Sequence, residues 1–422
     1  MRLLGSFVLL TLGGCTAIDN FGQFKVGSAV DAGGGDLGSS CSAGCTCIPA
    51  DTTLGIPAHC ALAFSNGLTC AGHDADTLTL DGAYTIVTGD PAANTTPPRM
   101  TGPGISLAGS VSGNVATFCI GSLVTTASST IAITGRRPLA FLADGELQFI
   151  GTISLGGGYA IDENGVAGGP GGTAGGDSAT DGTGTSGGKA GVTGVATTGS
   201  SGGSGGSGAG GAIAGGTGGA SVNGSATPGG PPIGSGNNPT GYGGGGGGAG
   251  YGTTKGGGGG GGGGVLQLSA GYSLSLAGAV DASGGGGAGG AQSAMGAGGG
   301  GGGGSGGSLF LESPTVTISS SSCLSVIGGP GGGGGGALAR GDNAKAGSGC
   351  GFAGMAGTGG SGGGGAGAQP NNGNGNGGNA TTVGGGGGGL GGYGHVVIRA
   401  HNPPNASASG AVPAASYTAL TL

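Results

Sequence analysis

Glycine is the feature that most constrains this chain, because it supplies 127 of the 422 residues. Glycine loses more conformational freedom on folding than any other residue, and it has no side chain to bury. A chain of this kind cannot be held along its whole length by a conventional hydrophobic core. We therefore expect hydrogen bonds between backbones to supply stability that side chains supply in other proteins.

The remaining composition limits the classes of function. Charged residues make up 6% of the chain, against about 25% in ordinary globular domains. The formal net charge is −7 and the ten basic residues are scattered, whereas a nucleic-acid partner requires clustered lysine and arginine. We therefore expect no nucleic-acid partner, and the composition is not typical of an enzyme.

The amino terminus has the pattern of a secretory signal. One positive charge at Arg2 precedes an apolar run from Leu3 to Leu12, and the small residues Gly13 and Gly14 follow. The apolar run is too short to span a bilayer, so it is typical of an export signal rather than of a membrane helix. This predicts that the rest of the chain works outside the cytoplasm.

The sequence Leu12-Gly13-Gly14-Cys15 resembles a bacterial lipobox, in which the signal is cut before the cysteine and that cysteine is acylated. The resemblance implies lipidation of Cys15 and attachment to a membrane through several acyl chains. Thr16 and Ala17 follow, without the aspartate that retains lipoproteins at the inner membrane. By resemblance to other lipoproteins, the outer membrane or cell surface is the expected location.

Eight cysteines remain besides Cys15, an even number in a compartment that permits disulfides. Five of them fall between Cys41 and Cys70, so at least one must stay free or pair outside that segment, for example with Cys119. An alternative is a zinc site, although no pair has C-x₂-C spacing and export favours oxidation. The disulfide candidates are Cys41, Cys45, Cys47, Cys60, Cys70, Cys119, Cys323 and Cys350, and the zinc alternative would draw on Cys41, Cys45, Cys47, His59, Cys60 and His73.

From Thr77 onward, apolar residues alternate with small or polar ones in short runs between turn residues. This period of two predicts β-strands, and no stretch after the signal has the spacing of an amphipathic helix. The runs are Leu78-Thr-Leu80, Ile105-Ser-Leu107, Phe118-Cys-Ile120 and Ile131-Ala-Ile133. We therefore expect an all-β fold.

A repeat becomes visible when distant segments are aligned. Residues 138–156 and 265–283 superpose without a gap, a third copy at 309–326 is shifted by about one residue, and a fourth at 396–400 is truncated. The matched pairs are Leu139/Leu266, Phe141/Leu268, Ala143/Ala270, Leu147/Leu274, Phe149/Leu276, Gly151/Gly278 and Ile153/Val280. One such unit, with a single apolar face, cannot bury that face alone, so stacking predicts the coils of a parallel β-helix or solenoid. A β-sandwich with disordered glycine-rich loops is the alternative.

Glycine tracts follow the same strand in each copy, and they cover 156–264, 284–307, 328–367 and 384–394. They read either as flexible linkers or as extended helices of three residues per turn that pack side by side. Triplets such as Gly202-Gly-Ser favour the second state, and the entropy of glycine favours the first. The expected organisation is a signal peptide at 1–14, a tether and cysteine-rich module at 15–76, the start of the solenoid at 77–160, a glycine-rich insert at 161–264, and coils interleaved with glycine tracts at 265–422.

The lipobox, the cysteine cluster, the phrase Gly135-Arg-Arg-Pro-Leu-Ala-Phe-Leu-Ala-Asp-Gly-Glu-Leu147 and the Asp281-Ala-Ser-Gly-Gly-Gly unit resemble glycine-rich surface lipoproteins of the myxobacterial type. The Gly-Gly-x stretches are also similar to the PGRS domains of mycobacterial surface proteins, without the helical domain that precedes them there. The resemblance implies a surface architecture and no particular activity.

Catalytic, cofactor-binding and metal-binding patterns are not found in the sequence, and we expect no cofactor. Arg136, Arg137, Asp144 and Glu146 lie together near the start of a predicted coil, and we interpret them as a surface turn rather than an active site. The tripeptide Arg340-Gly341-Asp342 matches an integrin ligand, and chance explains it in so glycine-rich a chain.

These observations predict a non-enzymatic, lipid-anchored cell-surface protein with a structural or adhesive role. Its partners would be the membrane, through the lipid, and extracellular matrix or polysaccharide. One alternative is a carbohydrate-active β-helix enzyme, which would need acidic residues gathered in a groove. Another is an ice-binding protein, which would need a flat face with regular spacing.

Overall fold

The computed structural model of the chain describes most of residues 77–400 and a few short stretches outside them. The chain divides into two compact units, Met1–Ser40 and Cys41–Leu422, and all described residues belong to the second. The expected signal peptide and most of the expected 15–76 module lie outside the described residues. These are 47–48, 59–60, 68, 77–92, 97–177, 179–192, 202–222, 224–233, 248, 250, 255–345, 354–361, 363–367, 375–400, 411–412 and 416–419.

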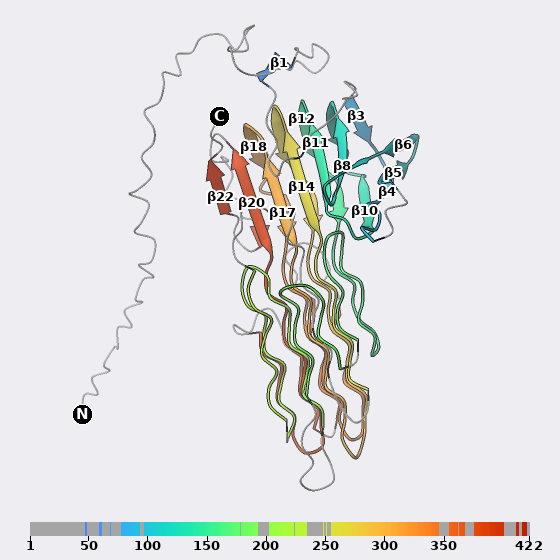
Figure 1. The fold of residues 1–422 in the computed structure, drawn as a ribbon, viewed down its shortest axis with the longest axis vertical. Coiled ribbons are helices and arrows are strands. Elements are labelled where there is room, and N and C mark those ends of the chain that lie inside the picture. Colours follow the sequence, from blue (N-terminus) through green and yellow to red (C-terminus); the bar gives the residue numbers. More distant parts are fainter. Residues whose placement is uncertain are drawn as a thin grey trace, which may run out of the picture. The chain divides into compact units, whose positions relative to one another are not determined.

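The described part of the chain is all-β, as the sequence predicts, and it contains no helix. Its strands form four sheets, of which the three larger ones are parallel or mixed (Figure 1). A short antiparallel sheet pairs β1 (Cys47–Ile48) with β2 (His59–Cys60). The five-stranded sheet has the order β18 (Thr315–Ile318), β15 (Ser273–Leu276), β12 (Glu146–Phe149), β9 (Ser122–Thr125) and β3 (Thr77–Leu80).

The two larger sheets follow the same progression along the chain. The seven-stranded sheet has the order β22 (Ser416–Ala419), β20 (His395–Ala400), β17 (Ser308–Glu312), β14 (Val265–Ala270), β11 (Leu139–Ala143), β8 (Val115–Ile120) and β7 (Ser110–Ser112). The eight-stranded sheet has the order β21 (Ala411–Val412), β19 (Cys323–Ser325), β16 (Ala279–Asp281), β13 (Thr152–Ser154), β10 (Thr130–Thr134), β4 (Ala83–Val87), β5 (Arg99–Gly102) and β6 (Ile105–Ala108).

A unit of three strands recurs along the chain and gives one strand to each of the seven-, five- and eight-stranded sheets. The units are β8-β9-β10, β11-β12-β13, β14-β15-β16 and β17-β18-β19, and each strand pairs in parallel with its counterpart in the next unit. The register joins Phe141 to Leu268 and Ile153 to Val280, as the sequence alignment predicts. The strands of a β-sandwich would pair with antiparallel neighbours instead, so the described pairing argues against that alternative.

Apolar side chains of equivalent strands stack in columns inside the units. One column contains Phe118, Phe141, Leu268, Leu311 and Ile398, which pair in successive strands of the seven-stranded sheet and are almost completely buried. The rings of Phe118 and Phe141 lie 5.6 Å apart between centroids. Such stacking buries the apolar face that one unit alone would leave in water.

The expectation of a single apolar face per strand is wrong for β11, whose outward residues are also apolar and buried. All five residues of β11 and all six of β14 are buried, so both faces of these strands are covered. On the outer face, Ala140 and Leu142 pack with Leu68 and Val115. The cause is that Leu68, in the predicted cysteine-rich module, lies against this face, whereas the repeat shows only the inner columns.

Two of the three larger sheets end, on the side of the first unit, in antiparallel strands. β4 pairs with β5, β5 with β6, and β7 with β8. The connecting turns contain Gly104 (φ +69°) and Gly113 (φ +60°), a left-handed conformation that favours glycine. Antiparallel pairing ends the stack of parallel strands, and it replaces a bare parallel edge that could template further strands.

The stacked core generates a stability prediction. Leu268→Ala removes most of a fully buried side chain between Phe141 and Leu311, and we expect a loss of roughly 2–5 kcal/mol in the free energy of unfolding. Thr317→Ala, on the exposed face of β18, is the control and should change it by less than about 0.5 kcal/mol. Urea unfolding measures both, and equal losses would contradict the stacked core.

Candidate binding surface of the glycine-rich bundle

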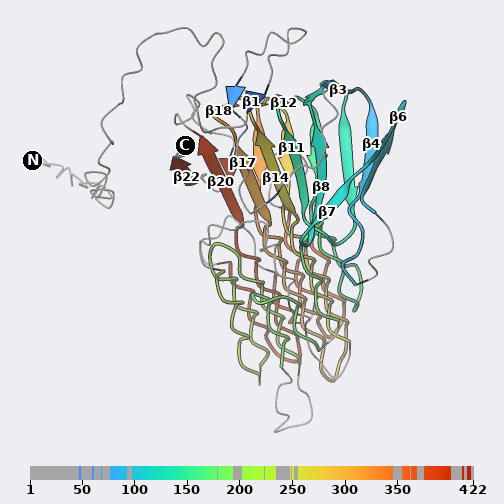
Figure 2. The ribbon, with the colours of Figure 1, turned by 45° about the horizontal axis from the view of Figure 1, so that its top comes forward.

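The glycine-rich inserts connect the eight-stranded sheet to the seven-stranded sheet. Residues 155–264 join β13 to β14, 282–307 join β16 to β17, and 326–394 join β19 to β20. Their described parts run side by side beyond one end of the strands (Figures 1 and 2). We call these parts the glycine bundle.

The tract 256–264 shows how the bundle is held. Its amide groups bond to three neighbouring tracts in turn, and each neighbour accepts a bond from every third residue. Gly257, Gly260 and Gly263 donate to the carbonyl oxygens of Gly299, Gly302 and Ser305 at 2.8–2.9 Å; Gly258, Gly261 and Gly264 donate to Asp162, Gly158 and Leu155; Gly259, Gly262 and Val265 donate to Gly176, Thr173 and Pro170. This repeat of three is that of an extended helix with no internal hydrogen bonds.

Close approach of the backbones explains why glycine fills these tracts. A Cβ atom added to Gly260 would lie 2.0 Å from the carbonyl oxygen of Gly285, and one added to Gly261 would lie 2.1 Å from that of Ala167. Real Cβ atoms do not come so close, so any side chain would push neighbouring tracts apart. The Cα–H groups at these positions face carbonyl oxygens, a weak but recurring attraction.

The described tracts are therefore packed segments rather than linkers in solvent. Every residue of 256–264 and of 297–307 is buried, and the amides of 257–264 and most of those of 297–307 donate to backbone carbonyl oxygens of neighbouring tracts. Of the two states that the sequence left open, these tracts have the packed one.

Serine occurs in the tract 202–211 at the same interval of three. Ser204 and Ser207 are fully buried. Their backbone amides donate to the carbonyl oxygens of Val192 and Lys189, and their hydroxyls accept bonds from the amides of those same residues at 2.7 Å. A serine can thus stand at a position where its oxygen adds a bond to the adjacent tract.

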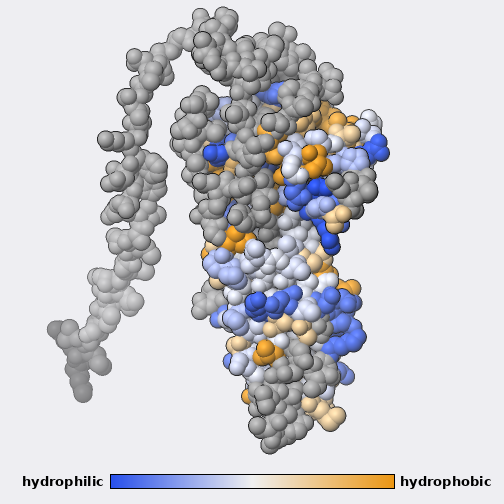
Figure 3. All heavy atoms as spheres, in the orientation of Figure 1, coloured by the Kyte–Doolittle hydropathy of each residue, from blue (hydrophilic) through white to orange (hydrophobic). Residues whose placement is uncertain are grey.

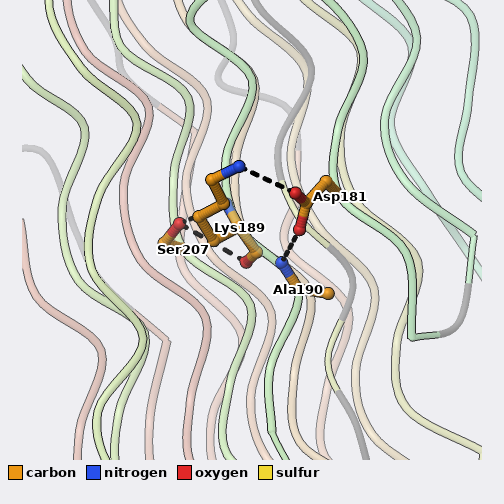
Figure 4. Close-up of polar contacts among 4 residues, drawn as sticks. All are labelled: Asp181, Lys189, Ala190 and Ser207. Carbon is orange, nitrogen blue, oxygen red and sulfur yellow. Dashed lines mark hydrogen bonds and ion pairs between the residues drawn. The ribbon is translucent and has the colours of Figure 1, made fainter.

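A carboxylate fixes the other side of the tract that contains Lys189 (Figure 4). Asp181 accepts a hydrogen bond from the Ala190 amide through Oδ1 and forms an ion pair with Lys189 Nζ through Oδ2, each at 2.8 Å. Ser207 holds the same segment from the opposite side. The side chains of Asp181 and Lys189 are about half exposed, so this contact lies at the surface of the bundle.

Partial burial raises the pKa of the Asp181 carboxyl, but the hydrogen bonds from Lys189 and from the Ala190 amide outweigh it and lower the pKa below its usual value. A carboxyl with a lowered pKa stabilises the folded chain above its unfolded pKa, and this contribution is lost as the pH falls through the folded pKa. The contact is therefore intact at neutral pH and is lost only in acid.

Side-chain oxygens also accept hydrogen bonds from backbone amides in other outer tracts. Asn376 and Asn379, three residues apart, accept bonds from the amides of Thr217 and Ala220 at 3.0 and 2.9 Å. Asp177 accepts one from the amide of Gly165 at 2.8 Å. Asparagine and aspartate thus take the place of backbone acceptors at the margin of the bundle, and the buried serines do so inside it.

The bundle surface described here is mixed rather than dominated by one apolar patch. Figure 3 shows the hydrophobic residues of this face scattered among polar ones. The large apolar side chains exposed on the bundle are Ile161, Val192, Ile213, Val222, Met295, Leu338 and Met355.

The structure addresses only some of the predicted cysteine sites. Cys15, Cys41, Cys45, Cys70 and Cys350 lie outside the described residues. Cys47 and Cys60 occupy opposed positions of β1 and β2. Cys119 and Cys323 each form a disulfide. The complete pairing scheme and the zinc alternative both stay predictions.

The charged residues that lie close in sequence are not gathered in space. Arg136 and Arg137 precede β11, while Asp144 and Glu146 follow it, so the two pairs lie at opposite ends of that strand. Arg137 is buried and donates to Asn114 Oδ1 at 3.1 Å. The groove lined with acids that a carbohydrate-active enzyme needs is not formed by these four residues.

The Arg340-Gly341-Asp342 side chains bond to the bundle itself. Arg340 donates to the carbonyl oxygen of Ile161 at 3.1 Å, and Asp342 accepts a bond from the hydroxyl of Thr358. These contacts give both side chains a structural role.

Comparison with known proteins found no matching family model, no matching curated protein and no matching solved structure. Within the described ranges, no helix has the length and hydropathy needed to cross a membrane. The same ranges contain no group of three or more histidine, cysteine, aspartate or glutamate side chains placed to hold a metal ion.

Close packing of the tracts generates a second prediction. Gly260→Ala forces a Cβ against the carbonyl oxygen of Gly285, so we expect a lower urea midpoint and faster amide exchange along 257–263. Gly156→Ala is the matched control, because its Cβ would lie an ordinary 3.5 Å from the nearest atom, the Ser283 oxygen. If both variants exchange deuterium at the wild-type rate, the packing described here is wrong.

A third prediction concerns the carboxylate contact. Asp181→Ala should speed deuterium exchange at the Ala190 amide, because that amide loses its acceptor, and leave exchange at Gly165 unchanged. Asp177→Ala should do the reverse, because Asp177 accepts from Gly165. Exchange resolved by residue in the two variants tests both contacts, and a uniform change across the bundle in either variant would argue against them.

Proposed function

We propose that the chain is a non-enzymatic, lipid-anchored cell-surface protein with a structural or adhesive role. In this proposal its strands form a parallel β-helix, and its glycine tracts form a bundle of extended polyglycine helices that continues the helix. Extracellular matrix or polysaccharide is the proposed class of partner, and the outer membrane or cell surface is the proposed location.

The observation that carries the proposal is the bonding of the glycine tracts to one another. Residues 256–264 have a backbone acceptor for each amide from Gly257 onward, supplied by tracts from two inserts. Such a body presents small side chains and few charges, and buried amides exchange slowly and resist proteolysis because local opening is costly. These properties suit a protein that persists outside the cell and meets other surfaces.

Export and anchoring rest on the sequence from Met1 to Cys15. The signal pattern and the lipobox resemblance agree in position, flanking charge and small residues. Acylation at several sites would hold the chain far more firmly than one acyl chain could, since each buried CH₂ contributes about 0.8 kcal/mol. The disulfides of Cys119 and Cys323 fit an oxidising compartment.

The enzymatic alternative has less support. Its four candidate residues do not form one site, because Arg136 and Arg137 precede β11 whereas Asp144 and Glu146 follow it.

The anchor provides the direct test of this proposal. The wild-type chain expressed in a Gram-negative host should appear in the membrane fraction and incorporate labelled fatty acid, and Cys15→Ala should leave an unprocessed precursor or a soluble product without label. Cys350→Ala is the control and should stay in the membrane fraction with label. Wild-type protein free in the medium with an unmodified amino terminus would overturn the lipoprotein assignment.

A further inference from the structure

The eight-stranded sheet has an exposed outer face at its centre. Strands β4, β10 and β13 lie side by side there, and every residue whose side chain points outward is exposed. These residues are Ala83, Thr85, Val87, Thr130, Ala132, Thr134, Thr152 and Ser154. We call them the threonine face.

The threonine face is a regular array. Thr130 pairs with Thr152 on one side and with Ala83 on the other, and Ala132 lies between Ser154 and Thr85. With no shift in register, neighbouring rows are separated by about 4.8 Å across the strands and by about 6.7 Å along them. Threonine and valine have restricted χ1 angles, so the methyl and hydroxyl groups are held in place before any partner arrives.

The chemistry of this face limits the partner. None of its eight residues is charged; exposed charges stand only at its margins, with Arg99 on β5 and Asp281 on β16 at its sides and Asp81 and Arg136 beyond the ends of β4 and β10. The one aromatic residue of these strands, Tyr84, is buried on the inner side. The face therefore offers no charge to a polyelectrolyte and no aromatic plane to a sugar ring, and it matches a partner that is itself uncharged.

Single hydroxyl contacts gain little, because each replaces a bond to water. Net binding requires many such contacts at once to a partner whose own groups are already fixed in position. We propose that the threonine face binds the surface of ice. Ice is uncharged, periodic and made wholly of hydrogen-bonding groups, and its molecules have already lost the freedom that a flexible solute would lose on binding.

The register of β4, β10 and β13 supplies the regular spacing that the sequence analysis required of an ice-binding protein. Ice binding goes beyond the proposed function and does not depend on the lipid anchor. It also does not involve the glycine bundle, whose interior backbone groups bond to one another.

The outer face of the five-stranded sheet provides a matched control within the same chain. Thr315 and Thr317 are exposed there on β18, but Glu146 and Gln148 stand in the same rows and interrupt the array with long polar side chains. A substitution at Thr317 therefore changes an exposed threonine of similar setting without touching the threonine face.

The test measures inhibition of ice recrystallisation and adsorption to growing ice by the purified full chain, its Thr152→Lys variant and its Thr317→Lys variant. The wild type and Thr317→Lys should inhibit and adsorb equally, and Thr152→Lys should need a concentration about tenfold or more above theirs, because one long cation lifts the array from a flat solid. Equal urea midpoints for the three chains show that folding is not the cause.

Three results would overturn the proposal. The wild type could leave ice recrystallisation unchanged, or the two lysine variants could lose activity equally. Adsorption to microcrystalline cellulose or chitin but not to ice, abolished by Thr152→Lys, would assign the face to a polysaccharide. A stable dimer in sedimentation that Thr152→Lys dissociates would show that a second copy covers the face.

Discussion

The hydrogen bond between neighbouring backbones is the interaction on which both the stacked strands and the glycine bundle depend. In the sheets it sets a spacing of about 4.8 Å between strands. The same kind of bond joins the tracts, and the chain passes from one to the other without a break: Gly263 donates to Ser305, Ser308 donates to Gly264, and Leu266 then pairs with Leu309 in the ladder. Units stacked at strand spacing therefore deliver their tracts at bonding distance from one another.

The two parts differ in how many sides of the backbone have neighbours. A strand has them on two sides, and its faces remain free for side chains such as the column through Phe141 and Leu268. A tract inside the bundle has them all around, and a Cβ on Gly301 would lie 2.0 Å from the oxygen of Gly258. Some of the side chains that do occur supply an oxygen in place of a backbone acceptor, as at Asn379. This distribution accounts for a composition in which glycine dominates and charge is rare.

Strand positions and register could be predicted from the sequence because a slip of one residue would turn the whole apolar set outward. The unit β8-β10 went unrecognised as a copy, since its turns differ from those of 138–156. Burial of both faces of β11 depends on Leu68, far away in sequence, and no local pattern reveals it. Order in the tracts could not be decided, because glycine has no side-chain pattern to read; the interval between Ser204 and Ser207 was the available signal. The Asp181 contact could not be predicted, because it depends on a turn between two tracts. The threonine face could not be predicted either, because it requires the register of three strands that are not consecutive in the chain.

The strands also make it possible for the glycine tracts to order at all. An isolated glycine segment would lose more entropy on ordering than any other sequence of its length. In the insert 282–307 both ends are fixed, by β16 and by β17, and these strands pair with neighbouring units, which lowers the remaining cost of bringing the tracts together. The inserts 155–264 and 326–394 add further turns between the same two sheets. Since tracts bond to one another along their length, the surface of the bundle can change in extent and in its side chains while the β units stay the same.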